Sequence, residues 1–297
     1  MSALVFPAPT GSGVVHWSGE KFLLDEGKRQ VRVLSYGVDK SGWTDELTHL
    51  HEDAAGGDYF IDVASRTHAL REIERSIEKI PSTILEVGCS SGFLLRDLVA
   101  NFPRHTVVGA DYTLDTLNAL APRFPGVPLL RFDLSRCPLP DAFADVVVLL
   151  NVLEHIEDDR SALAHLYRIT APGGHVIIEL PAGPRLFDVY DRALMHFRRY
   201  EMLKLVELCQ GAGFAIERRS HLGIFLYPLF YLTKRMNQFR FRNVDGPGAQ
   251  AAVAKMINTT SKSPPLMNRI MRAEAAVREH VYLPFGIRCL VTCRKPG

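Results

Sequence analysis

Thr83-Ile-Leu-Glu-Val-Gly-Cys-Ser-Ser-Gly92 is the stretch that decides the fold of this chain. Apolar residues surround one acid, Glu86, and the run then breaks into small residues that end at Gly92. This pattern indicates a buried strand, a tight turn whose backbone can approach a ligand closely, and a helix that follows directly. The stretch alone does not identify the ligand, because dinucleotide-binding proteins share the same strand–turn–helix arrangement.

A second acid extends the pattern. Asp111 lies nineteen positions after Gly92, at the end of the apolar segment 106–110, and the apolar residues between 93 and 102 recur with a helical period. The order is therefore strand, glycine turn, helix, strand, acid. An acid at the end of a second parallel strand lies beside the first turn, where its carboxylate can bind a ribose diol. The two motifs together predict a nucleoside-containing cofactor and leave open which one.

Two further motifs follow in the chain. Arg131-Phe-Asp-Leu134 precedes a proline-rich loop, and the nearly all-apolar run 144–150 is typical of a central parallel strand covered on both faces. That run ends at Asn151-Val-Leu-Glu-His155. A short helix, a turn at Pro172-Gly-Gly174 and a strand over 175–180 come next.

These four motifs, in this order and spacing, resemble the class I S-adenosylmethionine-dependent methyltransferases, and in particular their type 11/12 subgroup. The resemblance implies that Asp111 binds the ribose, that Asp133 receives the adenine amino group, and that backbone at Leu134 completes the adenine contact. The family usually has a third glycine where this chain has Ser90. The full set of cofactor-binding residues implied in this way is Tyr59, Arg66, Glu86, Gly88, Cys89, Ser90, Gly92, Asp111, Tyr112, Asp133, Leu134 and Asn151.

The expected fold is α/β: a Rossmann-like, seven-stranded mixed sheet with a helical N-terminal segment and a cap inserted before the last strand. In the family the last two strands form a reversed pair at one sheet edge. We expect residues 1–20 to be irregular, 30–36 to form one short strand and 45–80 to be mostly helical. The predicted units are an N-terminal extension (1–45), the cofactor-binding core (46–220), the cap (221–284) and the last core strand (285–297).

Three side chains are candidates for the chemistry. Methyl transfer needs an in-line nucleophile at about 3 Å, and an acceptor hydroxyl also needs a base within hydrogen-bond reach. His155 follows one strand, whereas His196 and Tyr200 belong to Asp191-Arg-Ala-Leu-Met-His-Phe-Arg-Arg-Tyr200, a run that resembles one found in the type 11/12 subgroup. The structural alternatives are that His155 starts a helical turn and that His196 caps the following helix.

Two other functions remain open. Tyr200-x-x-x-Lys204 matches the catalytic pair of short-chain dehydrogenases, which would make the chain a nicotinamide-dependent oxidoreductase. Ser90 could instead mark an inactive methyltransferase-fold partner subunit, since a left-handed backbone costs more at serine than at glycine. The favoured reading is a methyltransferase for a small, hydrophobic acceptor, through oxygen rather than carbon or nitrogen.

Composition fits this reading. The 297 residues are 47% hydrophobic with a net charge of +2, so no basic stripe indicates nucleic acid. Five cysteines show no metal-ligand spacing and suit a reducing cytoplasm, and we expect no metal. The apolar run 222–232 is shorter than the ~20 residues that span a bilayer. With its basic neighbours it is a candidate for binding the acceptor, a membrane surface or a second copy of the chain.

Overall fold

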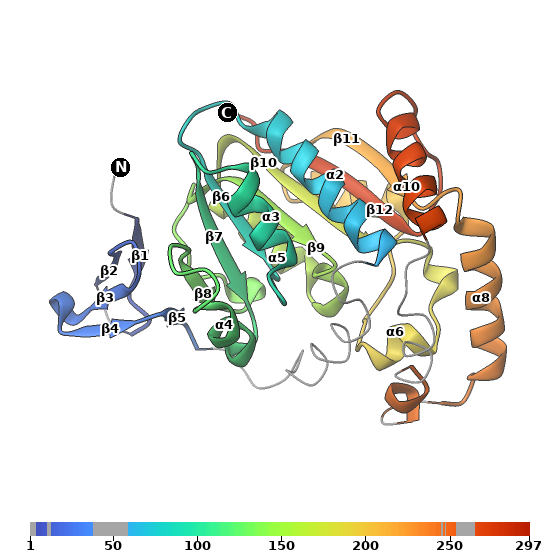
Figure 1. The fold of residues 1–297 in the computed structure, drawn as a ribbon, viewed down its shortest axis with the longest axis horizontal. Helices are drawn as coiled ribbons and strands as arrows, with labels where there is room; N and C mark the ends of the chain where they lie inside the picture. The colour runs from blue at the N-terminus through green and yellow to red at the C-terminus, as the bar shows by residue number, and fades with distance from the viewer. Residues whose placement is uncertain (1–3, 11–12, 38–58, 245, 247, 254–264) are drawn as a thin grey trace.

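A computed structural model describes residues 4–10, 13–37, 59–244, 246, 248–253 and 265–297. Its main feature is one eight-stranded mixed sheet, in the order β11-β12-β10-β9-β6-β7-β8-β5 (Figure 1). The strands are β5 (Val33–Ser35), β6 (Thr83–Val87), β7 (Thr106–Asp111), β8 (Leu129–Arg131), β9 (Ala144–Leu150), β10 (Thr170–Pro181), β11 (Ala215–Leu222) and β12 (Arg288–Arg294).

Strand direction follows the expected pattern. The strands from β10 to β5 pair in parallel, whereas β12 runs antiparallel to both β10 and β11. The predicted Pro172-Gly-Gly174 turn appears as a register shift within β10, between Thr170 and His175. The reversed pair at the β11 edge confirms the methyltransferase-like mixed sheet.

Helices cover both faces of this sheet. On one face α2 (Phe60–Ser76), α3 (Phe93–Asn101) and α4 (Leu114–Leu120) pack against side chains such as Ile84 and Val146. On the other face α5 (Asp159–Ile169) and α7 (Met202–Gly211) pack against their strand neighbours, Leu85 and Val147. Because successive strand residues point to opposite faces, the continuous apolar strands seen in the sequence supply both cores.

The N-terminal segment forms a second sheet, contrary to expectation. Strands β1 (Val5–Pro7), β2 (Val14–Trp17), β3 (Phe22–Leu24) and β4 (Arg29–Val31) make a four-stranded antiparallel sheet at the β5 edge of the molecule (Figure 1). The prediction of an irregular 1–20 segment is therefore wrong where β1 and β2 form. Phe6 and Phe22 meet edge to face with ring centroids 5.2 Å apart, which supplies apolar burial that the Pro- and Gly-rich composition concealed.

The predicted single strand over 30–36 is split between the two sheets. β4 ends at Val31 and β5 begins at Val33, so Arg32 is the point where the chain changes sheet. The Arg32 guanidinium donates to backbone carbonyls in the segment that follows α4, including Phe124 O at 2.7 Å. Parallel pairing of β5 with β8 then adds the eighth strand, which corrects the predicted seven.

The predicted helical segment 45–80 is confirmed by α2 over its second half, and 45–58 lies outside the described residues. Five short helical elements lie between the longer ones: η1 (Asp25–Gly27), η2 (Leu134–Arg136), η3 (Leu153–His155), η4 (Pro184–Leu186) and α6 (Val189–Ala193). Of these, η3 and the η4–α6 segment follow the carboxyl ends of β9 and β10, where the sequence placed its catalytic candidates.

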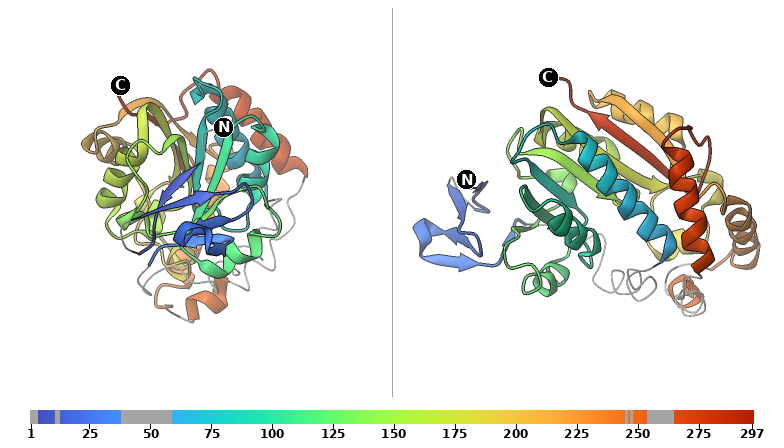
Figure 2. Two further views of the ribbon diagram at one scale, coloured as in Figure 1. Left: turned by 90° about the vertical axis from the view of Figure 1, so that its left-hand side faces the viewer. Right: turned by 45° about the horizontal axis from the view of Figure 1, so that its top comes forward.

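The insertion before the last strand is present as a helical cap. It contains α8 (Tyr227–Arg240) and α10 (Pro265–Arg278), which lie between β11 and β12 in the sequence. Helix α10 lies beside α2, and α8 lies past the carboxyl end of β10, next to η4 and α6 (Figures 1 and 2). The buried Glu274 carboxylate joins the two cap helices by accepting from Gly223 N–H at 2.6 Å and Phe225 N–H at 3.2 Å. Among the described residues, no helix is both long and apolar enough to cross a bilayer.

Candidate active site

The turn after β6 has the left-handed backbone that its small residues predict. Gly88 and Gly92 have φ values of +79° and +76°, and Ser90, in place of the family's third glycine, has φ +40°. A Cβ atom on Gly88 would lie 2.5 Å from Val152 Cγ2. Glycine is therefore required at position 88 because the turn after β6 packs directly on the segment after β9.

Asp111 lies beside this turn, at the end of β7. Its Oδ2 accepts a hydrogen bond from Ser90 N–H at 2.9 Å, and its Oδ1 accepts from Thr113 N–H and Oγ1 at 2.9 Å each. Burial raises the pKa of the Asp111 carboxyl, whereas these hydrogen bonds act to lower it. The hydrogen bond to Asp111 helps to hold Ser90 in its left-handed conformation and places an acid against the turn, as predicted.

Glu86 is the second acid at this position. Its side chain is buried, and Oε2 accepts no hydrogen bond from any described residue. Burial, with the nearby charge of Asp111, raises the pKa of Glu86 well above its ordinary value. Arg66, the helix residue predicted to reach the site, pairs with Asp97 at 2.9 Å. A buried carboxylate oxygen without a donor is costly, so it marks a place where a polar ligand would be stabilising.

The third predicted segment is Arg131 to Leu134, and part of its hydrogen-bonding capacity is used within its own turn. Asp133 caps η2 with Oδ1, which accepts from Ser135 N–H at 2.8 Å and Ser135 Oγ at 2.7 Å. One of the two carboxylate oxygens of Asp133 therefore stabilises this turn. Leu134 is buried. Tyr112 is joined to the same strand end because its carbonyl accepts from Arg131 Nε at 3.0 Å.

The remaining predicted residues lie in two places. Asn151, directly after β9, has φ +56°, and its buried Oδ1 has no hydrogen-bond partner among the described residues. Cys89 is buried in the glycine turn, where burial raises the pKa of its thiol well above the ordinary value. Tyr59 instead packs on an apolar cluster under the cap that includes Leu222 and Met271. It therefore lies on the cap side of the site.

The structure brings His155 and His196 together. Their ring centroids are 4.7 Å apart and the rings meet edge to face. The two segments that carry them are joined by a backbone hydrogen bond from Phe197 N–H to Glu154 O at 2.8 Å. The alternative that His155 starts a helical turn is wrong, since η3 begins at Leu153 and His155 is its last residue. Two imidazoles from separate segments thus lie side by side at the carboxyl edge of the sheet.

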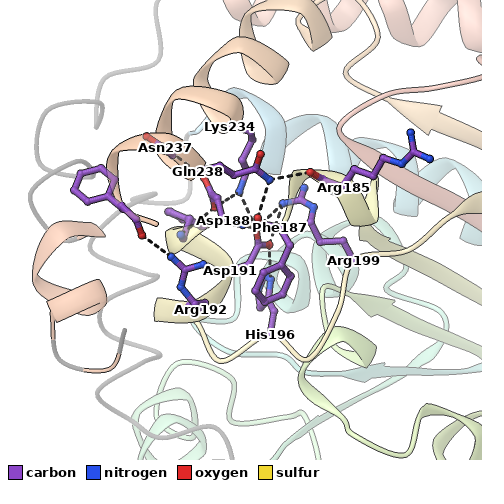
Figure 3. Close-up of polar contacts among 12 residues, drawn as sticks. Arg185, Phe187, Asp188, Asp191, Arg192, His196, Arg199, Lys234, Asn237 and Gln238 are labelled. Carbon is purple, nitrogen blue, oxygen red and sulfur yellow. Dashed lines mark hydrogen bonds and ion pairs between the residues drawn. The ribbon is translucent and has the colours of Figure 1, made fainter. Parts of the chain in front are cut away.

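His196 belongs to a buried network of five side chains, which we call the Asp191 network: Asp188, Asp191, His196, Arg199 and Lys234 (Figure 3). His196 Nδ1 lies 2.9 Å from Asp191 Oδ1. Arg199 Nη1 lies 2.9 Å from that same oxygen. Lys234, from the cap helix α8, lies 2.7 Å from Asp188 and 3.0 Å from Asp191. The network therefore joins the cap to the segment that presents His196.

The protonation states in this network follow from burial and charge. Burial alone would raise the pKa of Asp191, but the hydrogen bond from His196 and the charges of Lys234 and Arg199 lower it below its usual range. Burial lowers the pKa of His196, and the attraction of Asp191 does not fully offset this effect. Asp191 is thus ionised and His196 is a neutral imidazole near pH 7.

Tyr200 has a different environment from the two histidines. Its buried hydroxyl lies 3.0 Å from Asp159 Oδ2 and 3.2 Å from Leu153 O. Burial and the Asp159 charge raise the pKa of Tyr200. Lys204 points away and pairs with Glu201 at 3.4 Å on the exposed surface of α7. These contacts favour a structural role for Tyr200 and give it no lysine partner of the dehydrogenase kind.

Sequence reasoning missed Glu154, the neighbour of His155. The Glu154 side chain is 0% exposed, and neither of its carboxylate oxygens has a hydrogen-bond partner among the described residues. Burial raises the pKa of Glu154 to about 8. Its position in the motif after β9 was visible in the sequence. The lack of a partner was not, because it depends on how residues 182–200 fold over η3.

Comparison with known proteins identifies the domain. Residues 85–178 match the family described as "Methyltransferase domain". A probable S-adenosylmethionine-dependent methyltransferase of Mycolicibacterium smegmatis is 35% identical over 144 residues, which are 48% of this chain and 54% of that protein. Demethylmenaquinone methyltransferase of Thermus thermophilus is 32% identical over 138 residues, covering 43% and 62% respectively. The chain thus spans little more than half the length of these curated relatives.

A solved structure supports the same fold across more of the chain. The [4+2]-cyclase SpnF superposes with a TM-score of 0.56 over 84% of this chain and 92% of that one, at 16% identity. The sheet order, the glycine turn and these matches together show that residues 85–178 match a methyltransferase domain within a fold of the class I S-adenosylmethionine-dependent type. The cofactor that such a domain takes is S-adenosylmethionine.

The Asp191 network predicts a large stability effect at Lys234. Lys234→Met leaves two buried carboxylates without their shared cation, so the free energy of unfolding should fall by about 3–5 kcal/mol. Urea denaturation followed by circular dichroism measures this change. Lys204→Met is the matched control: its exposed pair with Glu201 should change stability by no more than about 0.5 kcal/mol. Equal effects of the two substitutions would contradict the assigned role of Lys234.

Proposed function

We propose that this protein transfers the methyl group of S-adenosylmethionine to a small hydrophobic acceptor, with oxygen favoured over carbon or nitrogen. The observation that carries the proposal is the pairing of two sites at one sheet edge. The Asp111 turn lies after β6 and β7, and the two adjacent imidazoles lie after β9 and β10. Ligands of open α/β sheets bind at this carboxyl edge.

The residues at the β6 turn fit the cofactor. The ribose diol offers two hydroxyl donors, which suit the carboxylate of Asp111. The buried Glu86 Oε2 and Asn151 Oδ1 are acceptors that lack donors among the described residues, and the hydroxyl and amino groups of S-adenosylmethionine would supply them. The cofactor carries the activated methyl group, and the protein's part is to orient it and to exclude water.

The two histidines support an oxygen acceptor. Transfer to a hydroxyl forms an O–C bond as the S–C bond breaks, and the hydroxyl proton must leave. Asp191 accepts from His196 Nδ1–H, which leaves Nε2 with the lone pair that takes this proton. His196 is therefore the base that the geometry favours, with His155 beside it.

The cap supports a hydrophobic acceptor. Tyr59 and Phe230 pack on the apolar cluster formed by Ile61, Leu222 and Met271. Beyond this cluster Phe225 is 52% exposed in the turn just before α8. An apolar molecule that entered between the cap and the sheet edge would gain favourable burial on this surface.

The first test is calorimetric titration with S-adenosylhomocysteine, the product of the cofactor, alongside NAD and NADP. We expect micromolar binding of S-adenosylhomocysteine alone. Asp111→Ala should weaken it by roughly 10- to 100-fold, because it removes a charged acceptor worth about 1.5–3 kcal/mol. Asp115→Ala, on the exposed side of α4, is the matched control. Binding of a nicotinamide cofactor would revive the dehydrogenase function, and binding of none would favour the inactive partner subunit.

The acceptor prediction is tested on the exposed turn just before α8. Phe225→Ala should raise the KM for an apolar acceptor by about 10-fold, since it removes an aromatic contact worth roughly 1.5 kcal/mol. Affinity for S-adenosylhomocysteine should not change. Release of S-adenosylhomocysteine, measured over a panel of hydroxylated aromatic and isoprenoid molecules, gives the kinetics. Leu203→Ala, exposed on α7, is the control, and unchanged kinetics in Phe225→Ala would count against a cap-bound acceptor.

The outer face of α8 supports contact with a membrane surface. Four exposed apolar residues follow at helical spacing along one face: Leu229, Leu232, Met236 and Phe239. Arg235, Arg240 and Arg242 are exposed on or just after the same helix. An apolar stripe flanked by cationic side chains suits a surface of anionic lipid, from which a hydrophobic acceptor could be drawn.

Flotation with lipid vesicles tests this contact. The protein should float with phosphatidylserine-containing vesicles and much less with purely zwitterionic ones. Met236→Glu combined with Phe239→Glu should abolish flotation and leave S-adenosylhomocysteine binding intact, because it places charges on the stripe. Failure to float, together with a dimer in sedimentation analysis that the double substitution dissociates, would instead assign the stripe to pairing of two copies.

A further inference from the structure

We propose that Glu154, His155 and His196 form a binding site for one divalent transition-metal ion. One ligand atom from each of the three side chains lies within 4.8 Å of the other two. The inference goes beyond the proposed methyl transfer, since binding of the ion is measured without S-adenosylmethionine. The sequence predicted no such site, because its ligands come from two separate segments.

The first argument is the state of Glu154. Its side chain is fully buried, and no other described residue donates a hydrogen bond to the carboxylate or forms an ion pair with it, so that only the N–H of Glu154 itself lies nearby. Native proteins rarely leave a buried carboxylate in this condition, because the loss of hydration is not compensated. A bound cation beside the two histidines would supply the missing compensation directly.

The second argument is the orientation of His196. Histidines that bind metals usually donate their other ring N–H to a carboxylate, which fixes the ring and makes the free nitrogen more basic. Asp191 accepts from His196 Nδ1 at 2.9 Å, and Asp191 is itself fixed by Arg199 and by the backbone N–H of Asp188 at 3.0 Å. Nε2 of His196 is thus the nitrogen available to an ion.

The third argument is charge. Within the Asp191 network, the carboxylates of Asp188 and Asp191 are matched by the cations of Lys234 and Arg199. The adjacent Glu154 has no hydrogen-bond partner and no ion pair among the described residues, so it takes no part in that balance. A divalent ion at Glu154 would therefore stabilise the ionised carboxylate that burial disfavours, since metal ligands bind in their deprotonated forms.

The donor set indicates the kind of ion. Two imidazoles and one carboxylate are typical of zinc and related transition ions, and unlike the all-oxygen sites that calcium and magnesium prefer. Sites with this set keep a coordination position open to water or substrate. The backbone hydrogen bond from Phe197 N–H to Glu154 O, 2.8 Å long, holds the two ligand segments together without the ion.

Binding of the ion does not depend on the proposed function, but its effect on an acceptor hydroxyl does. An acceptor hydroxyl at the open position would lose its proton to water more readily, because a bound transition ion lowers the pKa of a coordinated O–H group. The oxygen would then form the O–C bond while the electron pair of the broken S–C bond stays on sulfur. His196 would act as a ligand in that complex rather than as the base.

Metal titration of the untagged, full-length chain tests the site. After treatment with EDTA and dialysis, zinc is titrated by calorimetry and cobalt by visible absorption. We expect one ion per chain. Glu154→Gln should weaken zinc binding by roughly 100-fold. Loss of a carboxylate that only hydrogen-bonds to a metal ligand already costs about 10–100-fold in affinity, and Glu154 would bind the ion directly. Glu157→Gln, an exposed neighbour in the same loop, is the control and should bind as the unmodified chain does.

Several outcomes would overturn the proposal. They are an absence of zinc binding, equal affinity in Glu154→Gln and the unmodified chain, or a cobalt spectrum with thiolate charge-transfer bands, which would place the ion on cysteine. Glu154→Gln replaces a buried carboxyl group by a neutral amide of similar shape and is expected to fold. Binding of S-adenosylhomocysteine by Glu154→Gln and by the control Glu157→Gln verifies that they fold. It also separates failure of the metal site from failure of the proposed methyl transfer. His196→Gln is the second variant and should lose zinc binding to a similar extent.

Discussion

Parallel pairing of β6 with β7 and β9 is the constraint on which the rest of the site depends. It brings the carboxyl ends of these strands to one edge, so the turns that follow them must share a small volume. Gly88 shows how tight that arrangement is, because any side chain there would collide with Val152. The acids Glu86 and Asp111 then become neighbours in a buried environment, although the sequence separates them.

The Asp191 network fixes the segment after β10, as the strand pairing fixes the turns after β6 and β7. Lys234 reaches from the cap to two carboxylates of the segment after β10, and Arg199 meets Asp191 from within that segment. The favourable contacts largely offset the cost of burying these charges, and the geometry they impose is specific. A cap fixed by such contacts holds His196 against η3. Apolar packing alone would define this position less precisely, because it is not directional.

Three carboxylates at this edge carry raised pKa values for the same physical reason. Glu86, Asp111 and Glu154 are all buried, and loss of hydration disfavours their charged forms. Only Asp111 is held by several hydrogen bonds of its own chain. Perturbed and incompletely satisfied acids reduce stability, and proteins concentrate them where a ligand is to be bound.

The sequence by itself determined the central fold and the glycine turn with its acids at the strand ends, because strand periodicity, glycine turns and acids at strand ends are local signals. It did not reveal β1, β2 or the eighth strand, since those depend on aromatic packing and on pairing of β5 with β8, far away in the chain. Nor did it assign Tyr200, whose hydroxyl is taken up by Asp159. Only the tertiary structure decided that Glu154, His155 and His196 converge, because the backbone hydrogen bonds and buried charges that bring them together join segments with no common sequence pattern.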